Sequence, residues 1–127
     1  MATSTPPELI ELRDNGLDWR IYNYDGCNLT LAANNTLTYG HVLELRFTDV
    51  TYINCPTEFY SPQFRLASPN ELQYLQSFLD LLGQFAVMID AEAKNSIEPR
   101  PFVVCADSLS LHRVDVSYVK TEHKNAK

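Results

Sequence analysis

The sequence has few of the residues that common nucleotide-binding and hydrolytic motifs require. It contains four glycines, at positions 16, 26, 40 and 83, and no Walker loop, GxGxxG or GxSxG motif. Such motifs use glycine because the backbone must approach a phosphate group closely or turn sharply at a nucleophile. We therefore expect no cofactor.

Cysteine is also scarce. The three cysteines, Cys27, Cys55 and Cys105, are odd in number and form no CxxC pair, and no histidine lies at metal-ligand spacing from them. A disulfide framework needs paired cysteines, and a zinc site needs ligands at characteristic spacings. Neither a disulfide scaffold nor a metal site is expected.

Basic charge is in short supply. Ten Lys and Arg stand against sixteen Asp and Glu, which gives a net charge of -6. Residues 1–119 hold seven bases and fifteen acids, a balance of 7 − 15 = -8. Binding to a phosphate backbone depends on basic charge, so nucleic acid is not an expected partner, whereas a basic protein would be compatible.

Long hydrophobic runs are missing as well. The longest apolar run falls far short of the ~20 residues that a membrane-spanning helix needs, and residues 1–7 lack the basic start and apolar stretch of an export signal. We expect a cytoplasmic protein that does not bind a membrane.

What is present indicates one globular domain. The 127 residues are 45% hydrophobic and 20% charged, which is ordinary for a folded protein of this size. We found no repeat or linker that divides the chain, and we expect one domain over 1–127 with flexible tails at 1–7 and 121–127.

Alternating apolar residues predict several strands. The turn signal Asp25-Gly26 predicts a hairpin between residues 17–24 and 28–32. Residues 41–53 are typical of one long strand, or of two strands broken near Asp49. Strands are also predicted over 102–106 and 109–120, the second with a bulge or an edge position near Arg113, where its apolar face changes.

One segment carries a strong helix signal. Ser68 to Glu71 forms a capping-box pattern with proline at the first helical position, and Gly83 is a candidate stop. The apolar stripe that the helix must bury consists of Leu72, Leu75, Leu79 and Leu82. The fold class expected is α+β: a mainly antiparallel twisted sheet with one principal helix, about 69–82, packed on one face. Residues 84–94 either continue this helix or, as we favour, form a strand.

The segment 52–64 is the candidate binding region, because it gathers four aromatic residues around two prolines. A loop over 54–62 would hold the rings in place, and rings held in this way offer contact area with little entropy to lose. The candidate binding residues are Tyr52, Cys55, Phe59, Tyr60 and Phe64. The alternative is that Phe59 and Phe64 only cover one end of the core.

Two classes of function remain open. The favoured one is a noncatalytic module that binds another protein or itself, with a homodimer expected. The alternative is a small enzyme or small-ligand binder in which Cys55 or Cys105 meets His41 or His112 in a pocket. No residue is assigned a catalytic role.

Overall fold

A computed structural model describes residues 5–94, 96 and 98–118, so the predicted tail at 121–127 and most of the one at 1–7 lie outside the described residues. The helices are α1 (Pro7–Glu11) and α2 (Pro69–Gln76). The strands are β1 (Asp18–Tyr24), β2 (Leu29–Asn34), β3 (Gly40–Thr48), β4 (Tyr52–Asn54), β5 (Glu58–Leu66), β6 (Phe85–Ala93), β7 (Arg100–Ala106) and β8 (Ser108–Ser117).

The fold is mainly β. Strands account for 54% and helices for 12% of the structure. The prediction of a mainly antiparallel sheet is confirmed, but the expected α+β class is not, because α2 is only eight residues long and α1 only five. Within the described ranges, no helix has the length and apolar character needed to cross a membrane.

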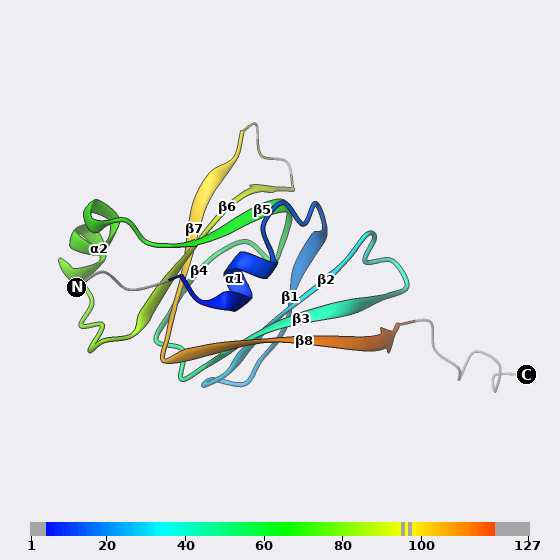
Figure 1. The fold of residues 1–127 in the computed structure, drawn as a ribbon, viewed down its shortest axis with the longest axis horizontal. Coiled ribbons are helices and arrows are strands. Elements are labelled where there is room, and N and C mark those ends of the chain that lie inside the picture. Colours follow the sequence, from blue (N-terminus) through cyan, green and yellow to red (C-terminus); the bar gives the residue numbers. More distant parts are fainter. Residues whose placement is uncertain (1–4, 95, 97, 119–127) are drawn as a thin grey trace, which may run out of the picture.

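Within the described residues, the eight strands belong to one antiparallel sheet in the order β4-β7-β6-β5-β1-β2-β3-β8. The two ends of this order are joined. Strand β3 continues into β4 after a bend at Asp49, and β7 continues into β8 through Asp107, so β3–β4 and β7–β8 pair along their length as one bent ribbon. The Asp107 N–H donates to the Thr48 carbonyl, and the Thr51 N–H donates to the Cys105 carbonyl, so the pairing continues through the bend. The sheet therefore closes on itself (Figure 1).

The interior of this rolled sheet is the main hydrophobic core. Trp19 lies fully buried between Phe59, which stacks on it, and Phe64, which meets it edge to face. The alternation predicted for 41–53 is confirmed, since the three residues Leu43, Leu45 and Phe47 all point into the core. The helix α1 adds Leu9 to it and contacts β8, and Leu12, which follows the helix, is also in the core.

Two further sequence predictions are confirmed. The segments around Asp25-Gly26 pair as the antiparallel hairpin of β1 and β2. The β3–β8 pairing shifts register between His41 and Leu43, opposite Val116 and Arg113, which places the predicted irregularity beside Arg113.

The prediction of a loop over 54–62 is wrong in its second half. Strand β5 begins at Glu58 and includes Pro62, and its pairing with β6 shifts register between Tyr60 and Gln63. Proline cannot donate to a sheet ladder, so it is tolerated where a bulge interrupts the pairing. Ser61 adopts a φ of 48° at this point.

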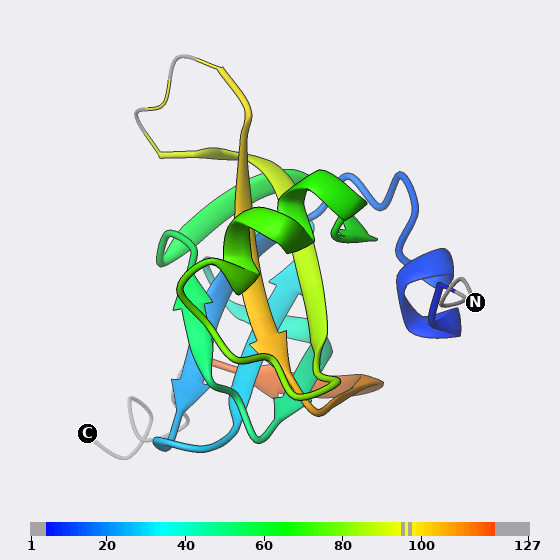
Figure 2. The ribbon, with the colours of Figure 1, turned by 90° about the vertical axis from the view of Figure 1, so that its left-hand side faces the viewer.

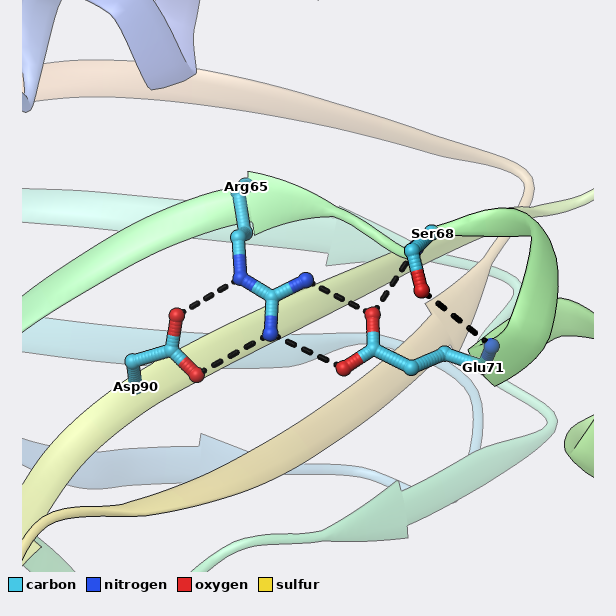
Figure 3. Close-up of polar contacts among 4 residues, drawn as sticks. All are labelled: Arg65, Ser68, Glu71 and Asp90. Atoms are coloured by element: carbon cyan, nitrogen blue, oxygen red, sulfur yellow. Dashed lines mark hydrogen bonds and ion pairs between the residues drawn. The ribbon is translucent and has the colours of Figure 1, made fainter.

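The start of α2 follows the sequence pattern. The Ser68 hydroxyl accepts from the Glu71 N–H at 3.2 Å, and the Glu71 carboxylate accepts from the Ser68 N–H at 2.8 Å. Figure 3 shows Arg65 of β5 between the Glu71 and Asp90 carboxylates, with its Nη1 2.6 Å from one and its Nε 2.6 Å from the other. The helix start is thus tied to both β5 and β6. The Arg65 hydrogen bond lowers the pKa of Glu71 to about 2.

The end of α2 differs from the prediction. The helix stops at Gln76 rather than Leu82, and Leu82 and Gly83 have φ values of 49° and 82°, which no right-handed helix contains. Leu75 and Leu81 are buried, whereas Leu82 is exposed, so the expected four-leucine stripe is only partly realised. The strand favoured for 84–94 is confirmed as β6.

The buried side of α2 covers part of the outer face of the sheet. Figure 2 shows α2 crossing in front of β6 and β7. The second hydrophobic cluster lies between them and consists of Leu75, Leu81, Ala86, Met88, Val103 and Cys105. Strands β6 and β7 are therefore apolar on both faces, which explains the near-continuous apolar runs in their sequences.

Candidate functional site

The three cysteines lack the surroundings of reactive thiols. The exposed Cys27 lies 3.2 Å from a carboxylate oxygen of Asp49, and this contact raises the pKa of the thiol. Burial raises the pKa of Cys55 to about 11 and also raises the pKa of Cys105. A reactive cysteine needs a lowered pKa, so each of these thiols is protonated at neutral pH.

The histidines bind groups other than cysteine. His41 is fully buried, with its Nε2 2.7 Å from the Glu44 carboxylate and its Nδ1 2.6 Å from the Tyr118 hydroxyl. Nε2 of His112 lies 2.8 Å from the Ser110 hydroxyl. The structure therefore does not bring the predicted cysteine and histidine candidates together through hydrogen bonds.

The protonation pattern around His41 follows from its neighbours. Burial disfavours the charge on Glu44, but hydrogen bonds from His41 and Arg46 outweigh it, so the pKa of this carboxyl is lowered. An ionised carboxylate only accepts hydrogen bonds, so Nε2 of His41 donates to Glu44, while Nδ1 is engaged with the Tyr118 hydroxyl. Neither ring nitrogen of His41 is then free for a substrate.

The His41 cluster, made of Tyr22, His41, Glu44, Arg46 and Tyr118, is covered by rings rather than by a helix. Tyr22 packs edge to face on His41 and stacks on Tyr118. Strand β8 can approach β3 closely because Gly40 has no side chain: a Cβ at this position would clash with the Val116 carbonyl oxygen. This cluster fixes the end of β8 against β3.

The predicted binding residues of segment 52–64 separate in the structure. Phe59 and Phe64 lie in the interior core, as the alternative interpretation proposed, although in a strand rather than a covering loop. Cys55 packs against the same core. Tyr60 is half-buried and its hydroxyl donates to Glu58, while the half-buried Tyr52 lies on the outside, next to α2.

Tyr52 belongs to a ladder of surface rings that the sequence did not reveal. Its ring centroid lies 5.8 Å from that of Phe78, and Phe78 lies 5.3 Å from Tyr74, both in edge-to-face geometry. Tyr74 is 69% exposed and Phe78 48% exposed. The spacing of Tyr74 and Phe78 by four residues was the available signal, because residues four apart share one face of a helical turn. We call these three residues the aromatic ladder.

Leu82 is unusual on two counts. It is 86% exposed, and its φ of 49° lies in the left-handed region that favours glycine or asparagine. A leucine in this position gains little from burial and adds backbone strain. Its presence is not explained by the stability of the fold.

An acidic recess lies beside the aromatic ladder. Loops after β1, β3, α2 and β7 line an open recess of about 390 Å³ on the surface. Its acidic residues are Asp49, Asp80 and Asp107, and Thr51 and Leu82 also line it. Figure 2 shows the loop after α2 descending toward the turns at this end of the sheet. In the described part of the chain, no cluster of His, Cys, Asp and Glu is arranged to hold a metal ion.

Comparison with known proteins gives no assignment: no family model matches the chain, and no curated protein or solved structure matches it significantly.

Proposed function

We propose that the chain is a noncatalytic module that binds another protein through the aromatic ladder and Leu82. The observation that carries this proposal is the exposure of Tyr74, Phe78 and Leu82 on adjoining segments, α2 and the loop that follows it. Rings of this kind supply large contact areas, and burying one such side chain contributes about 1.5–3 kcal/mol. Exposed apolar patches on otherwise polar surfaces mark interaction sites.

The strain at Leu82 supports the same conclusion. A bulky residue with positive φ persists only where something other than local stability favours it. The exposed Leu82 side chain contributes little to the stability of the isolated chain, but it would contribute to binding once a partner covers it.

The hydrogen bonding of the polar residues gives less support to a thiol enzyme. His41 has both nitrogens engaged, and the pKa of each of the three cysteines is raised. A thiol nucleophile needs an adjacent base or a lowered pKa. The binding module is the function that this geometry favours.

Selection from a random peptide library displayed on phage tests the proposal. Peptides enriched on the natural protein should lose binding to a ladder variant with Tyr74→Ser, Phe78→Ser and Leu82→Asn. The control variant carries Ile10→Ser, Tyr39→Ser and Val42→Thr, which replace exposed hydrophobic residues elsewhere. Enriched peptides that bind the ladder variant as well as the control variant would contradict the proposal, as would a failure to enrich any peptide.

A second copy of the chain is one such protein partner, and we propose a homodimer through the same surface. Size-exclusion chromatography with light scattering should show a dimer that the ladder variant converts to a monomer. A natural protein that stays monomeric at micromolar concentration would remove the homodimer from the proposal and leave binding to a different protein.

A further inference from the structure

We propose that the segment bound by the aromatic ladder carries an arginine or lysine beside an apolar side chain, and that this cation enters the acidic recess. This inference rests on the proposed function and specifies the chemistry of the partner. It concerns a protein segment, because a segment of chain is long enough to contact both the apolar ladder and the acidic recess next to it.

The ladder and the recess lie close to each other, because Leu81 lines the recess and packs in the same hydrophobic cluster as Tyr52 of the ladder. Thr51 lines the recess and directly precedes Tyr52 of the ladder, and Leu82 stands at the recess beside Leu81. The volume of about 390 Å³ falls within the range of roughly 300–1,000 Å³ that is typical of ligand pockets. A chain segment that lays an apolar residue on the rings would therefore place its next residues over the recess.

The charges of the recess are not compensated within the described chain. Five acidic side chains elsewhere are paired with arginine: Glu58 with Arg20, Glu44 with Arg46, Glu71 and Asp90 with Arg65, and Glu11 with Arg113. Other exposed acids, such as Glu92, form no ion pair among the described residues, but they do not converge on one recess as the three aspartates do. Among the described residues, none of the three recess aspartates forms an ion pair, and no Lys or Arg lines the cavity.

The hydrogen bonds of the recess leave carboxylate oxygens available. Asp49 accepts from the Cys27 thiol, and Asp107 accepts from the Gln84 amide at 2.9 Å. Asp80 makes no hydrogen bond with another described residue. Both donors are neutral, so an entering guanidinium or ammonium would supply the only positive charge near three carboxylates, and charge-assisted hydrogen bonds of this kind are the stronger ones.

The negative charge of the whole chain favours the same partner. A net charge of -6 repels acidic segments and raises the association rate of basic ones at low ionic strength. Among protein segments, those with a basic residue beside an apolar one match both parts of the surface.

The peptides selected above provide the test. Peptides that depend on Tyr74 and Phe78 should contain an Arg or Lys near an apolar residue. A recess variant with Asp49→Asn, Asp80→Asn and Asp107→Asn should bind them about tenfold more weakly, the factor that corresponds to about 1.4 kcal/mol. Binding should also weaken as ionic strength rises from about 0.01 to 0.15 M, because the screening length falls from about 30 to 8 Å.

A matched control removes the same number of charges elsewhere. Glu92→Gln, Glu98→Gln and Asp115→Asn alter exposed acids that form no ion pair among the described residues, and this variant should retain nearly all of the affinity. The single variant Asp80→Asn guards against misfolding, because Asp80 makes no hydrogen bond that the fold would lose.

The outcomes separate the two proposals. Ladder-dependent peptides without a basic residue, or with equal affinity for the recess variant and its matched control, would overturn the acidic-recess inference and leave the binding module in place. Peptides whose binding is indifferent to Tyr74 and Phe78 would overturn the proposed function and this inference together.

Discussion

Two parts of the outer face of the sheet are buried, and they are covered in different ways. Over β6 and β7, the helix α2 packs Leu75 onto apolar side chains. Over β3, the buried His41 and Glu44 are covered by Tyr22 and Tyr118 and joined by hydrogen bonds. The first part gains stability from apolar area, which is nondirectional, and the second from bonds that require fixed geometry. Substitutions in the two parts should therefore change the free energy of unfolding in different ways.

The largest effect is expected in the apolar part. Leu75→Ala should lower the free energy of unfolding by about 3 kcal/mol, because it leaves a cavity under α2. Urea denaturation measures this, and Leu72→Ala, at a half-buried position, serves as the smaller-effect control. A loss below about 1 kcal/mol would show that α2 contributes little packing.

A somewhat smaller loss is expected in the polar part. His41→Ala should cost about 2 kcal/mol, because it leaves the Glu44 carboxylate and the Tyr118 hydroxyl without their partner. A double-mutant cycle with Glu44→Ala should be non-additive, whereas His41→Ala combined with Leu75→Ala should be additive. Additivity within the first pair would contradict the coupling that the hydrogen bonds imply.

Acid should weaken the attachment of α2. The pKa of Glu71 is lowered from 4.5 to about 2, so its ionised form is favoured by folding. Its contribution is fully present above pH 4.5 and is lost as pH falls toward 2. Glu71→Gln should cost about 1–2 kcal/mol at neutral pH. Thermal unfolding across this pH range should show a shallower acid dependence for the variant than for the natural protein.

The smallest effect has the opposite sign. Leu82→Asn should stabilise the protein by about 0.5–1 kcal/mol, because asparagine tolerates positive φ and the lost side chain is exposed. The same variant should weaken peptide binding. A destabilised Leu82→Asn protein would show that Leu82 is retained for the fold, and would remove the argument from strain.

The sequence predicted the parts of the fold that obey a simple period. The alternation of Leu43, Leu45 and Phe47 identified β3 and its buried face. The leucine spacing after Ser68 identified α2 but not its end, because Leu79 and Leu82 keep the helical period beyond the turn where the chain leaves the helix. Pro62 favours a loop in the sequence, but a bulge accommodates it within β5.

The candidate surface was predicted only in part. Of the five expected binding residues, Tyr52 lies in the aromatic ladder, whereas Phe59 and Phe64 belong to the core. Whether an aromatic residue faces inward depends on the register of its strand, and register depends on distant partners. The contact of His41 with Glu44 could not be predicted from strand alternation, which places residues three apart on opposite faces. The β3–β8 register shift lies between these two residues.

The bent ribbon of β3 and β4 against β7 and β8 limits when the sheet can close during synthesis. It joins residues 40–54 to residues 100–117, so the sheet stays open until β8 has been synthesised. Contacts between such distant segments slow folding, because a long loop must close before they form. A chain that stops before β8 would expose the interior around Phe47 and Leu45 and would be a substrate for chaperones.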